Sequence, residues 1–335
     1  MTSEHLTDAA MNSMLVSIGV GVVDRLEYFK QAVQAALAQT WPHIEVLVGD
    51  DGDCAAVQDW CLGVAEHDPR LKYHHNDRRL GIAGNWNAIA GRAAGEFIVL
   101  PGDDDRLLPQ FVERLLAAAT PETALVFSNH HIIDVNGRRV PEETARMTRQ
   151  YHRSLLPAGQ VPAAVCAWRL AICPSAALVR RRALLQLGFG DDLTSPDVDL
   201  FIRLASQHSR FDFVPEYLVE FRQHPLNLTS AGLRHDTLLR RLLGISVPAE
   251  IEPLKRELLE HLAVTAASRH LERGDGLAAR RVLQCGYYPA SSRRAAYFTQ
   301  LACALLPSSL GGRLYRSILQ VKRATRPSPG TDADV

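Results

Sequence analysis

Short apolar runs and helical repeats alternate along the first part of the chain. The apolar run Met14–Val20 is followed by Glu27–Gln39, where apolar residues recur at helical spacing. Trp41 and Pro42 end this repeat, and Ile44–Val48 has the composition of a buried strand. The order predicts a strand, a helix and a second strand at the start of the chain.

The alternation continues as far as Phe127. It predicts helices at Ala55–Glu66 and Ile82–Ala93 and strands at Leu71–His75 and Glu96–Leu100. Such alternation favours an α/β fold whose doubly wound, mainly parallel sheet has helices on both faces. Ligands of these sheets bind beyond the carboxyl ends of the strands, where two acidic turns follow in this sequence.

The later segments differ in character. Residues 141–165 contain three prolines and little apolar periodicity, so we expect a mobile loop over the site there. The pattern predicts a helix at Asp197–Ser206 and a strand at Phe211–Val219. After about residue 235 only helical repeats remain, the longest at Leu254–Leu271.

These changes divide the chain into four parts. We expect a flexible N-terminus over residues 1–11, an α/β domain over 12–235, an all-α extension over 236–325 and a disordered tail over 326–335. A chain of 335 residues is long enough for a large domain and a smaller appendage. With 47% hydrophobic and 22% charged residues, its composition is that of a folded protein.

Charge is balanced over the whole chain but not within its parts. Residues 1–235 contain 22 Lys and Arg against 28 Asp and Glu, whereas residues 236–335 contain 15 against 9. Residues 276–331 contain nine basic residues and no acidic one, a bias that suits an anionic membrane surface. A solvated helix face is the alternative, and nothing in the sequence indicates nucleic-acid binding.

Cysteine usage and the N-terminal segment bear on location. The six cysteines form no CxxC pair and no short cluster with histidine, which argues against a zinc site and a disulfide framework. The first residues lack a signal-peptide pattern, and no apolar run reaches the length of a membrane span. We therefore expect a cytoplasmic protein, either free or attached peripherally to the inner face of the membrane.

The two acidic turns carry the candidate chemistry. Asp103, Asp104 and Asp105 gather three carboxylates, which repel one another unless a cation neutralises them. Mg²⁺ or Mn²⁺ would suit the turn, because these ions bind one or two carboxylates together with water and phosphate oxygens. A solvated acidic turn is the alternative. At the earlier turn, a carboxylate could accept hydrogen bonds from a ribose or a base, and helix capping by Asp53 is the alternative.

The order of these segments resembles a known enzyme family. The opening of the large inverting glycosyltransferase family 2, which has the GT-A fold, is similar to VSIGVGVVDRLEYFKQAVQAALAQTWPHIEVLVGDDGD. The stretch that leads into its DXD motif is similar to GIAGNWNAIAGRAAGEFIVLPGDDDRLLP, and its acceptor-side segment resembles SPDVDLFIRL followed by FRQHPLNLTS. The resemblance covers roughly residues 14–232 and implies a bacterial polysaccharide-type enzyme.

The resemblance implies a site for a nucleotide-diphosphate sugar. Asp51 would bind the nucleotide at its base or ribose, and Gly81 would allow close backbone approach to the diphosphate and sugar. The residues implied in donor binding are Gly21, Val22, Asp24, Asp51, Arg79, Gly81, Asn85, Asp103 and Arg222.

The resemblance also implies a metal site. Gly102 stands where many members have the first Asp of the motif, so Asp104 matches the residue that usually holds the metal. Asp103 or Asp105 is expected to compensate, and Asp105 is the second residue expected to bind the metal. His224 matches a histidine that can reach the metal or the diphosphate, and Arg222 near it would pair with phosphate oxygens.

Asp197, in SPDVDL, matches the family's catalytic base. An acceptor hydroxyl must lose its proton as it attacks the anomeric carbon, and a positioned carboxylate can accept that proton. Attack from the face opposite the departing nucleotide diphosphate would invert the configuration of the sugar. Asp199 would point elsewhere on the helix and is expected to be a helix N-terminal charge.

Two other functions fit parts of the sequence. A nucleotidyltransferase is expected to have a basic residue in a glycine-rich loop after its first strand, and Gly19–Asp24 contains no lysine. A catalytically inactive scaffold or nucleotide-sugar-binding protein is favoured by Gly102. For an active enzyme, the expected acceptor is a saccharide or lipid-linked saccharide of a surface polysaccharide or glycolipid, and UDP, dTDP and GDP donors all remain open.

Overall fold

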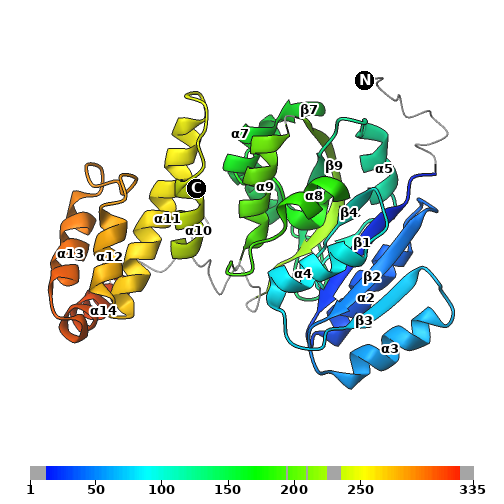
Figure 1. Cartoon of the computed structure of the whole chain (residues 1–335), viewed down its shortest axis with the longest axis horizontal. Coiled ribbons are helices and arrows are strands. Elements are labelled where there is room, and N and C mark those ends of the chain that lie inside the picture. The colour runs from blue at the N-terminus through cyan, green and yellow to red at the C-terminus, as the bar shows by residue number, and fades with distance from the viewer. Residues whose placement is uncertain (1–12, 194, 209, 225–234, 325–335) are drawn as a thin grey trace, which may run out of the picture. The chain divides into compact units, whose positions relative to one another are not determined.

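The computed structural model describes residues 13–193, 195–208, 210–224 and 235–324. The chain divides into two compact units, residues 1–233 and residues 234–335, and each is described by itself. All strands belong to the first unit, whereas the described part of the second contains helices only, as Figure 1 shows. The predicted N-terminal and C-terminal tails, residues 1–11 and 326–335, lie outside the described residues.

A nine-stranded sheet forms the centre of the first unit, with the order β3-β2-β1-β4-β8-β6-β9-β5 and with β7 paired to β9. The strands are β1 (Val16–Val22), β2 (Ile44–Asp50), β3 (Leu71–His75), β4 (Phe97–Val99), β5 (Arg106–Leu107), β6 (Leu125–Ile133), β7 (Gly159–Pro162), β8 (Ala177–Arg180) and β9 (Arg210–Arg222). Pairing is parallel from β3 to β4 and between β6 and β9, whereas β5, β7 and β8 run antiparallel to their neighbours. The expected, mainly parallel α/β sheet is thus confirmed, with antiparallel β8 between its two parallel parts.

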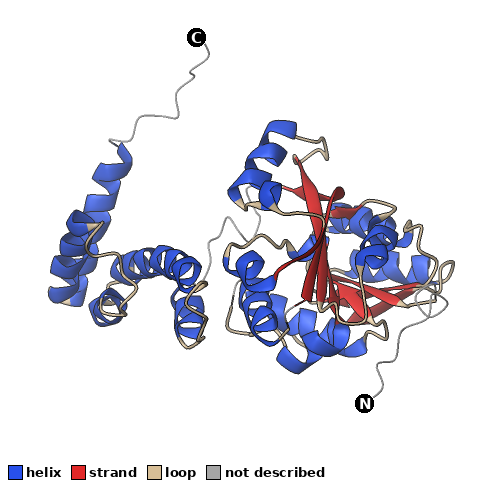
Figure 2. Cartoon of the chain, turned by 90° about the horizontal axis from the view of Figure 1, so that it is seen from above, coloured by secondary structure: helices blue, strands red, loops and turns tan. Residues whose placement is uncertain are grey.

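Helices cover both faces of this sheet, as Figure 2 shows. They are α2 (Leu26–Leu37), α3 (Ala55–Ala65), α4 (Gly81–Arg92), α5 (Phe111–Ala118), α6 (Pro141–Gln150), α7 (Ala163–Trp168), α8 (Arg181–Leu187) and α9 (Pro196–Gln207), with short 3-10 turns at Arg153–Leu155 and Pro174–Ala176. Strands covered on both faces bury nearly every residue, and β1 and β2 bury the polar Ser17, Glu45 and Asp50 along with their apolar residues.

The prediction of a mobile loop at residues 141–165 is wrong. The segment contains helix α6, a 3-10 turn and strand β7. The buried face of α6 is formed by Thr144 and Thr148, whose hydroxyls donate to the carbonyls of Val140 and Thr144, so the helix has no apolar repeat. Strand β7 pairs only with β9 in the described part of the sheet, and its Pro162 is compatible with such a strand.

Glycines in β1 and β2 let α4 approach the sheet closely. A Cβ on Gly49 would lie 2.4 Å from Asn85 Oδ1 and 2.7 Å from Ile89 Cγ1, and one on Gly19 would lie 2.4 Å from Ile89 Cγ2. Any side chain at these two positions would therefore push α4 outward. Because α4 begins beside the end of β2, this contact fixes the distance between the first acidic turn and the helix that follows it.

The second unit is an array of helices, as the sequence predicts. Its elements are α10 (His235–Leu243), α11 (Glu252–Glu272), α12 (Gly276–Leu283), α13 (Arg294–Leu305) and α14 (Ser308–Ala324). Buried leucines and alanines of α10 and α11 form its core. Helix α14 is joined to its neighbours through the Tyr315 hydroxyl, which lies 2.8 Å from Ser268 Oγ and accepts from Gln300 Nε2 at 2.9 Å. None of the described helices meets the length and hydropathy needed to cross a bilayer.

Gly49→Ala should lower the free energy of unfolding by about 1–3 kcal/mol, because the new methyl group overlaps Asn85 and Ile89. Denaturant unfolding followed by circular dichroism measures the change. Gly63→Ala is the matched control, since a Cβ there meets nothing within 4 Å and Gly63 lies inside α3. That variant should be as stable as wild type or more stable by up to about 1 kcal/mol. Equal effects of the two substitutions would contradict the packing argument.

Candidate active site

The second acidic turn follows β4 and leads into β5. The side chains of Asp103, Asp104 and Asp105 are all buried within the first unit. A buried carboxylate is costly unless it is hydrogen-bonded or paired with a positive charge. The partners of each carboxylate therefore indicate which of them anchor the turn and which face a ligand.

Asp105 anchors the turn. Its Oδ2 accepts from the Ser175 hydroxyl, and its Oδ1 accepts from the backbone N–H of Arg222 at 2.9 Å. Burial, with the neighbouring Asp104 charge, raises the pKa of Asp105 to about 8. Both oxygens are thus engaged by the 3-10 turn before β8 and by the end of β9. The expected role of Asp105 as a metal ligand stays a prediction that would require these contacts to change.

Asp103 and Asp104 share a cationic partner, Arg25, in the loop between β1 and α2. The guanidinium contacts both oxygens of Asp103, and its Nη1 lies 2.8 Å from Asp104 Oδ2. Burial, together with Asp104, raises the pKa of Asp103 to about 6 against the opposing effect of Arg25. The sequence argument that a cation should sit at this turn is met in the structure by an arginine that the sequence analysis did not assign to the site.

His224 completes this cluster from the residues after β9. Its Nε2 lies 2.8 Å from Asp104 Oδ2 and 3.0 Å from Arg25 Nη1, and its ring is 5.7 Å from that of Tyr28. The structure therefore brings together three of the residues singled out from the sequence, Asp103, Asp104 and His224. They come from segments 120 residues apart, and Arg25 is the common contact of all three.

Arg222 holds the backbone of the acidic turn next to this cluster. Only 1% of this residue is exposed, and its guanidinium donates to the backbone carbonyls of Asp104 and Asp134 and to Gln31 Oε1 at 2.9, 3.1 and 3.0 Å. It also stacks 4.4 Å from the centre of the Tyr28 ring. The interpretation of Arg222 as a phosphate ligand stays a prediction. In this arrangement the side chain holds the acidic turn in place.

The first acidic turn belongs to a separate hydrogen-bonded group. Asp51 accepts from Leu80 N, Gly81 N and Asn76 Nδ2 at 2.6, 2.8 and 3.1 Å, and so caps the start of α4. Asn85 donates to Gly49 O at 2.8 Å and accepts from Asn76. A nucleotide contact by Asp51 would have to use the lone pairs that these bonds leave, because each carboxylate oxygen has more than one.

The other residues expected at the donor lie around this group. Gly21 and Val22 end β1, with Gly21 packed against the Asn85 amide. Asp24 and Arg79 are exposed in the loops after β1 and β3. Gly81 has a φ of 73°, a left-handed conformation that favours glycine, and its N–H is turned to Asp51. All five residues therefore lie at the carboxyl ends of parallel strands or in the segments that follow them.

Asp197 lies in the first turn of α9 and is half-buried. Burial raises its pKa to about 6, while its own backbone N–H and that of Val198 oppose the shift. Burial, with a smaller effect of Asp105, raises the pKa of the nearby Cys173 thiol to about 12. Asp199 instead pairs with Arg203 one helical turn away, in agreement with its expected structural role.

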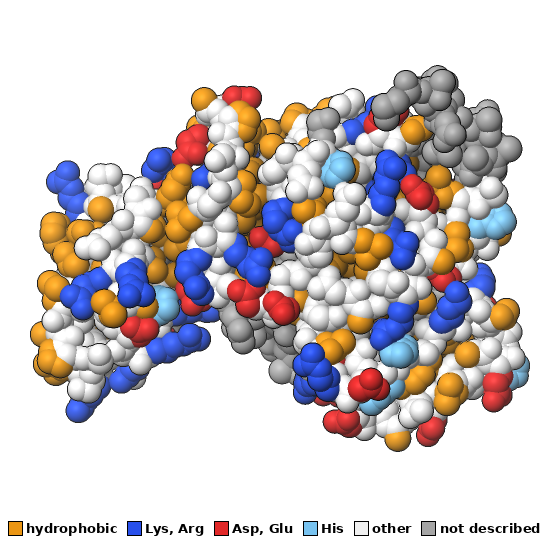
Figure 3. All heavy atoms as spheres, in the orientation of Figure 1, with side chains coloured by type: hydrophobic (Ala, Val, Ile, Leu, Met, Phe, Trp, Pro, Cys, Tyr) orange, Lys and Arg blue, Asp and Glu red, His pale blue; other side chains and the backbone are white. Residues whose placement is uncertain are grey.

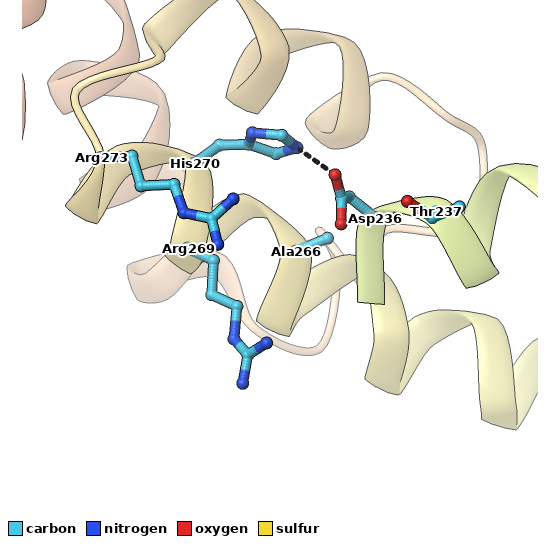
Figure 4. Close-up of a pocket in the computed structure, with 6 residues that line it drawn as sticks. All are labelled: Asp236, Thr237, Ala266, Arg269, His270 and Arg273. Carbon is cyan, nitrogen blue, oxygen red and sulfur yellow. Dashed lines mark ion pairs between the residues drawn. The ribbon is translucent and has the colours of Figure 1, made fainter. Parts of the chain in front are cut away.

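A hollow in the second unit is too small for the donor. It is lined by Asp236, Thr237, Ala266, Arg269, His270 and Arg273 and measures about 220 Å³, below the roughly 300–1,000 Å³ of ligand pockets. Figure 4 shows Asp236 and His270 turned toward each other, 3.8 Å apart, with Arg269 pointing away from them. The pair joins α10 to α11, and we assign the hollow a structural role.

Comparison with known proteins identifies the fold and the family. The model of glycosyl transferase family 2 matches residues 17–188, which is about half of the chain and contains both acidic turns. The chain belongs to glycosyl transferase family 2. The match ends before α9 and β9, so the segments that carry Asp197, Arg222 and His224 lie outside it.

Similar proteins support the same assignment. The succinoglycan biosynthesis protein ExoO of Rhizobium meliloti is 30% identical over 149 residues, which are 44% of this chain and 41% of ExoO. A GalNAc(5)-diNAcBac-PP-undecaprenol beta-1,3-glucosyltransferase of Campylobacter jejuni is 29% identical over 34% of this chain and 37% of its own. The chain thus spans about two fifths of these relatives. The crystal structure of S. aureus TarS 1-349 with UDP-GlcNAc is 15% identical, with a TM-score of 0.66 over 91% of this chain and 92% of that one, which confirms the GT-A fold.

Arg222→Met should lower the free energy of unfolding by about 3 kcal/mol, because the buried Asp104 carbonyl and Gln31 Oε1 lose their donor and the stacking on Tyr28 is lost. Arg79→Met should leave stability unchanged, since Arg79 is exposed, and should instead weaken binding of a nucleotide sugar. Denaturant unfolding and donor titration of the two variants distinguish the roles. If Arg222→Met were fully stable and lost only donor affinity, Arg222 would be a phosphate ligand and not a support of the turn.

Proposed function

We propose that this protein is an inverting glycosyltransferase that moves a sugar from a nucleotide-diphosphate sugar to an acceptor hydroxyl. The observation that carries the proposal is the cluster of Asp103, Asp104 and His224 around Arg25 in a family 2 fold. Carboxylates that require a cation can hold a metal ion, and that ion can in turn bind the diphosphate of a donor. A carboxylate whose pKa is raised can act as a general base. The TarS structure, which shares the fold, contains UDP-GlcNAc.

Asp197 is the proposed base. The acceptor oxygen forms a bond to the anomeric carbon as the bond from that carbon to the diphosphate oxygen breaks. The hydroxyl proton passes to the Asp197 carboxylate, and the bonding electrons leave with the nucleotide diphosphate. Attack and departure on opposite faces of the sugar invert its configuration. Burial, which raises the pKa of Asp197 to about 6, makes this carboxylate a stronger base than an exposed aspartate and leaves it ionised at neutral pH.

The residues present fit a divalent cation, Mg²⁺ or Mn²⁺. Asp104 Oδ2 and His224 Nε2 converge within 2.8 Å, and the Arg25 guanidinium already lies against both as a stand-in cation. No group of three His, Cys, Asp or Glu in the described ranges is arranged to hold a metal. Asp104 and His224 would therefore supply one or two ligands, and water and the donor's diphosphate the rest. Such an ion would stabilise the negative charge that develops on the departing diphosphate.

An inactive, nucleotide-sugar-binding scaffold is the second candidate, and Gly102 is the observation that favours it. A Cβ at this position would lie 2.7 Å from Asp104 Oδ1 and 3.1 Å from Asp105 Oδ2, so the aspartate common here in the family would collide with the other two. The turn instead has its three carboxylates at positions 103–105. Because Asp104 still contacts His224, we favour the active enzyme.

We also propose that the acceptor is a saccharide, free or lipid-linked, of a surface polysaccharide or glycolipid. ExoO is named for succinoglycan biosynthesis, and the Campylobacter enzyme is named for an undecaprenol-linked saccharide. In the second unit, Leu310, Leu314 and Val321 of α14 are 53, 43 and 63% exposed. Basic and hydrophobic side chains lie beside one another over these C-terminal helices in Figure 3. An amphipathic helix of this kind can bind an anionic membrane surface, where lipid-linked acceptors reside.

Asp197→Asn should abolish transfer without lowering stability. The amide cannot accept the acceptor proton, while the cost of burying a charged carboxylate disappears, so the free energy of unfolding at pH 7 should stay equal or rise. Hydrolysis and transfer from a panel of UDP, dTDP and GDP sugars with Mn²⁺ measures activity, and Asp104→Ala tests the metal. In the wild type, kcat/KM should rise with pH through about 6 and then level off, because the base must lose its own proton first. Transfer by Asp197→Asn at the wild-type rate would rule out this base.

Leu310→Ser combined with Leu314→Ser should weaken binding to vesicles that contain anionic lipid by about tenfold or more, because the apolar face of α14 is lost. Co-sedimentation with vesicles at low and high salt measures it. Leu185→Ser is the matched control, since Leu185 is 44% exposed on α8 in the other unit. Equal vesicle binding by all three proteins would overturn the membrane proposal.

A further inference from the structure

Arg25 occupies the place where a cation is required. Its Nη1 lies 2.8 Å from Asp104 Oδ2 and 3.0 Å from His224 Nε2, the two groups that would hold a divalent ion. Its Nε and Nη2 engage the two oxygens of Asp103. One guanidinium thus satisfies two neighbouring carboxylates and reaches the histidine, in the bidentate manner that arginine favours with carboxylates.

These contacts exclude a metal at the same groups. His224 Nε2 lies 2.8 Å from Asp104 Oδ2 and 3.0 Å from Arg25 Nη1, and this one nitrogen either donates a proton to the carboxylate or offers its lone pair to the guanidinium. A metal would need that lone pair, so an ion can bind His224 only when Nε2 carries no proton and Arg25 has left its side. An ion held by both Asp104 and His224 would need the space beside these two groups, and Arg25 Nη1 now lies within 3.0 Å of both of them. Two positive charges this close would also repel each other strongly in a partly buried site.

We propose that Arg25 is a displaceable internal counter-cation, which competes with the divalent ion for Asp104 and His224 and is released when metal and donor bind. The inference rests on the proposed function, since it concerns the metal of that site. The Arg25 side chain is 29% exposed and belongs to a loop, so it can leave the carboxylates without opening the core. It lies one residue after Asp24, at the edge expected to approach the nucleotide, where a released guanidinium can pair with phosphate oxygens.

The arrangement gives the empty enzyme a stable acidic turn and couples metal binding to the donor. Without Arg25, Asp103 and Asp104 would repel each other across a buried turn whenever no metal is bound. With Arg25 in place, the apparent dissociation constant for the ion equals the intrinsic one divided by the fraction of molecules in which the ion pairs are open. A donor that attracts the guanidinium raises this fraction, so metal and donor should bind with positive cooperativity.

The test is a titration of the full chain with Mn²⁺ alone, in which the EPR signal reports free ion. Arg25→Met should bind Mn²⁺ more tightly than wild type by about fivefold or more in the absence of donor. Arg25→Gln is a second variant in case Arg25→Met does not fold. Arg114→Met is the matched control for lost charge, since Arg114 forms an exposed ion pair with Glu216, and it should bind Mn²⁺ like wild type. Mn²⁺ should also raise the melting temperature of Arg25→Met more than that of wild type.

The outcomes separate the two proposals. If wild type binds Mn²⁺ and neither Arg25 variant binds it more tightly, the metal function stands and the competition by Arg25 is refuted. If no protein binds Mn²⁺ even with a UDP, dTDP or GDP sugar present, metal dependence fails and the inference fails with it. If Arg25→Met and Arg114→Met tighten binding equally, the effect is one of net charge and Arg25 holds no special place.

Discussion

The negative charge of Asp103, Asp104 and Asp105 is the constraint on which the rest of the first unit depends. Three consecutive carboxylates buried in one turn can persist only if each finds a proton, a donor or a positive charge. Asp105 is held by Ser175 and by the backbone of Arg222, and Asp103 and Asp104 are held by Arg25. These partners come from segments far apart in the sequence of the unit, so the turn ties together the start of the chain, the residues before β8 and the end of β9.

This dependence explains the mixed sheet. β8 follows the 3-10 turn that carries Ser175, and it lies between β4 and β6. β9 pairs in parallel with β6 and delivers Arg222 at its last residue, directly before the segment with His224. The parallel half, β3 to β4, provides the strand ends beyond which a donor is expected, and the other half provides the groups that neutralise the turn. The site thus lies where these two halves meet.

Much of this was predictable from pattern. Alternating apolar runs located β1 to β4 and their helices, and the family resemblance selected Asp104 and His224, which the structure brings within 2.8 Å. The sequence pattern did not predict helix α6, because the buried face of this helix consists of threonines. Their hydroxyls bond to carbonyls of the same helix, so the sequence shows no apolar residues at helical spacing. The sequence analysis did not assign Arg25 to the site, because a single arginine in a loop belongs to no periodic pattern. Its role depends on contacts with Asp103 and His224, which are 78 and 199 positions away in the sequence. The one signal in the sequence was the uncompensated negative charge of the turn, which indicated a cation but not which residue or ion supplies it.

Gly102 shows how the same constraint limits the sequence of the motif. An aspartate there would place its Cβ 2.7 Å from Asp104 Oδ1, and a fourth carboxylate would join three that are already buried. Asp103 takes up that charge one position later, where Arg25 can reach it, while Asp105 is turned to Ser175. Gly102 and Arg25 therefore act in the same direction: the glycine keeps a fourth carboxylate out of the turn, and the arginine balances the charge of two of the three that are present.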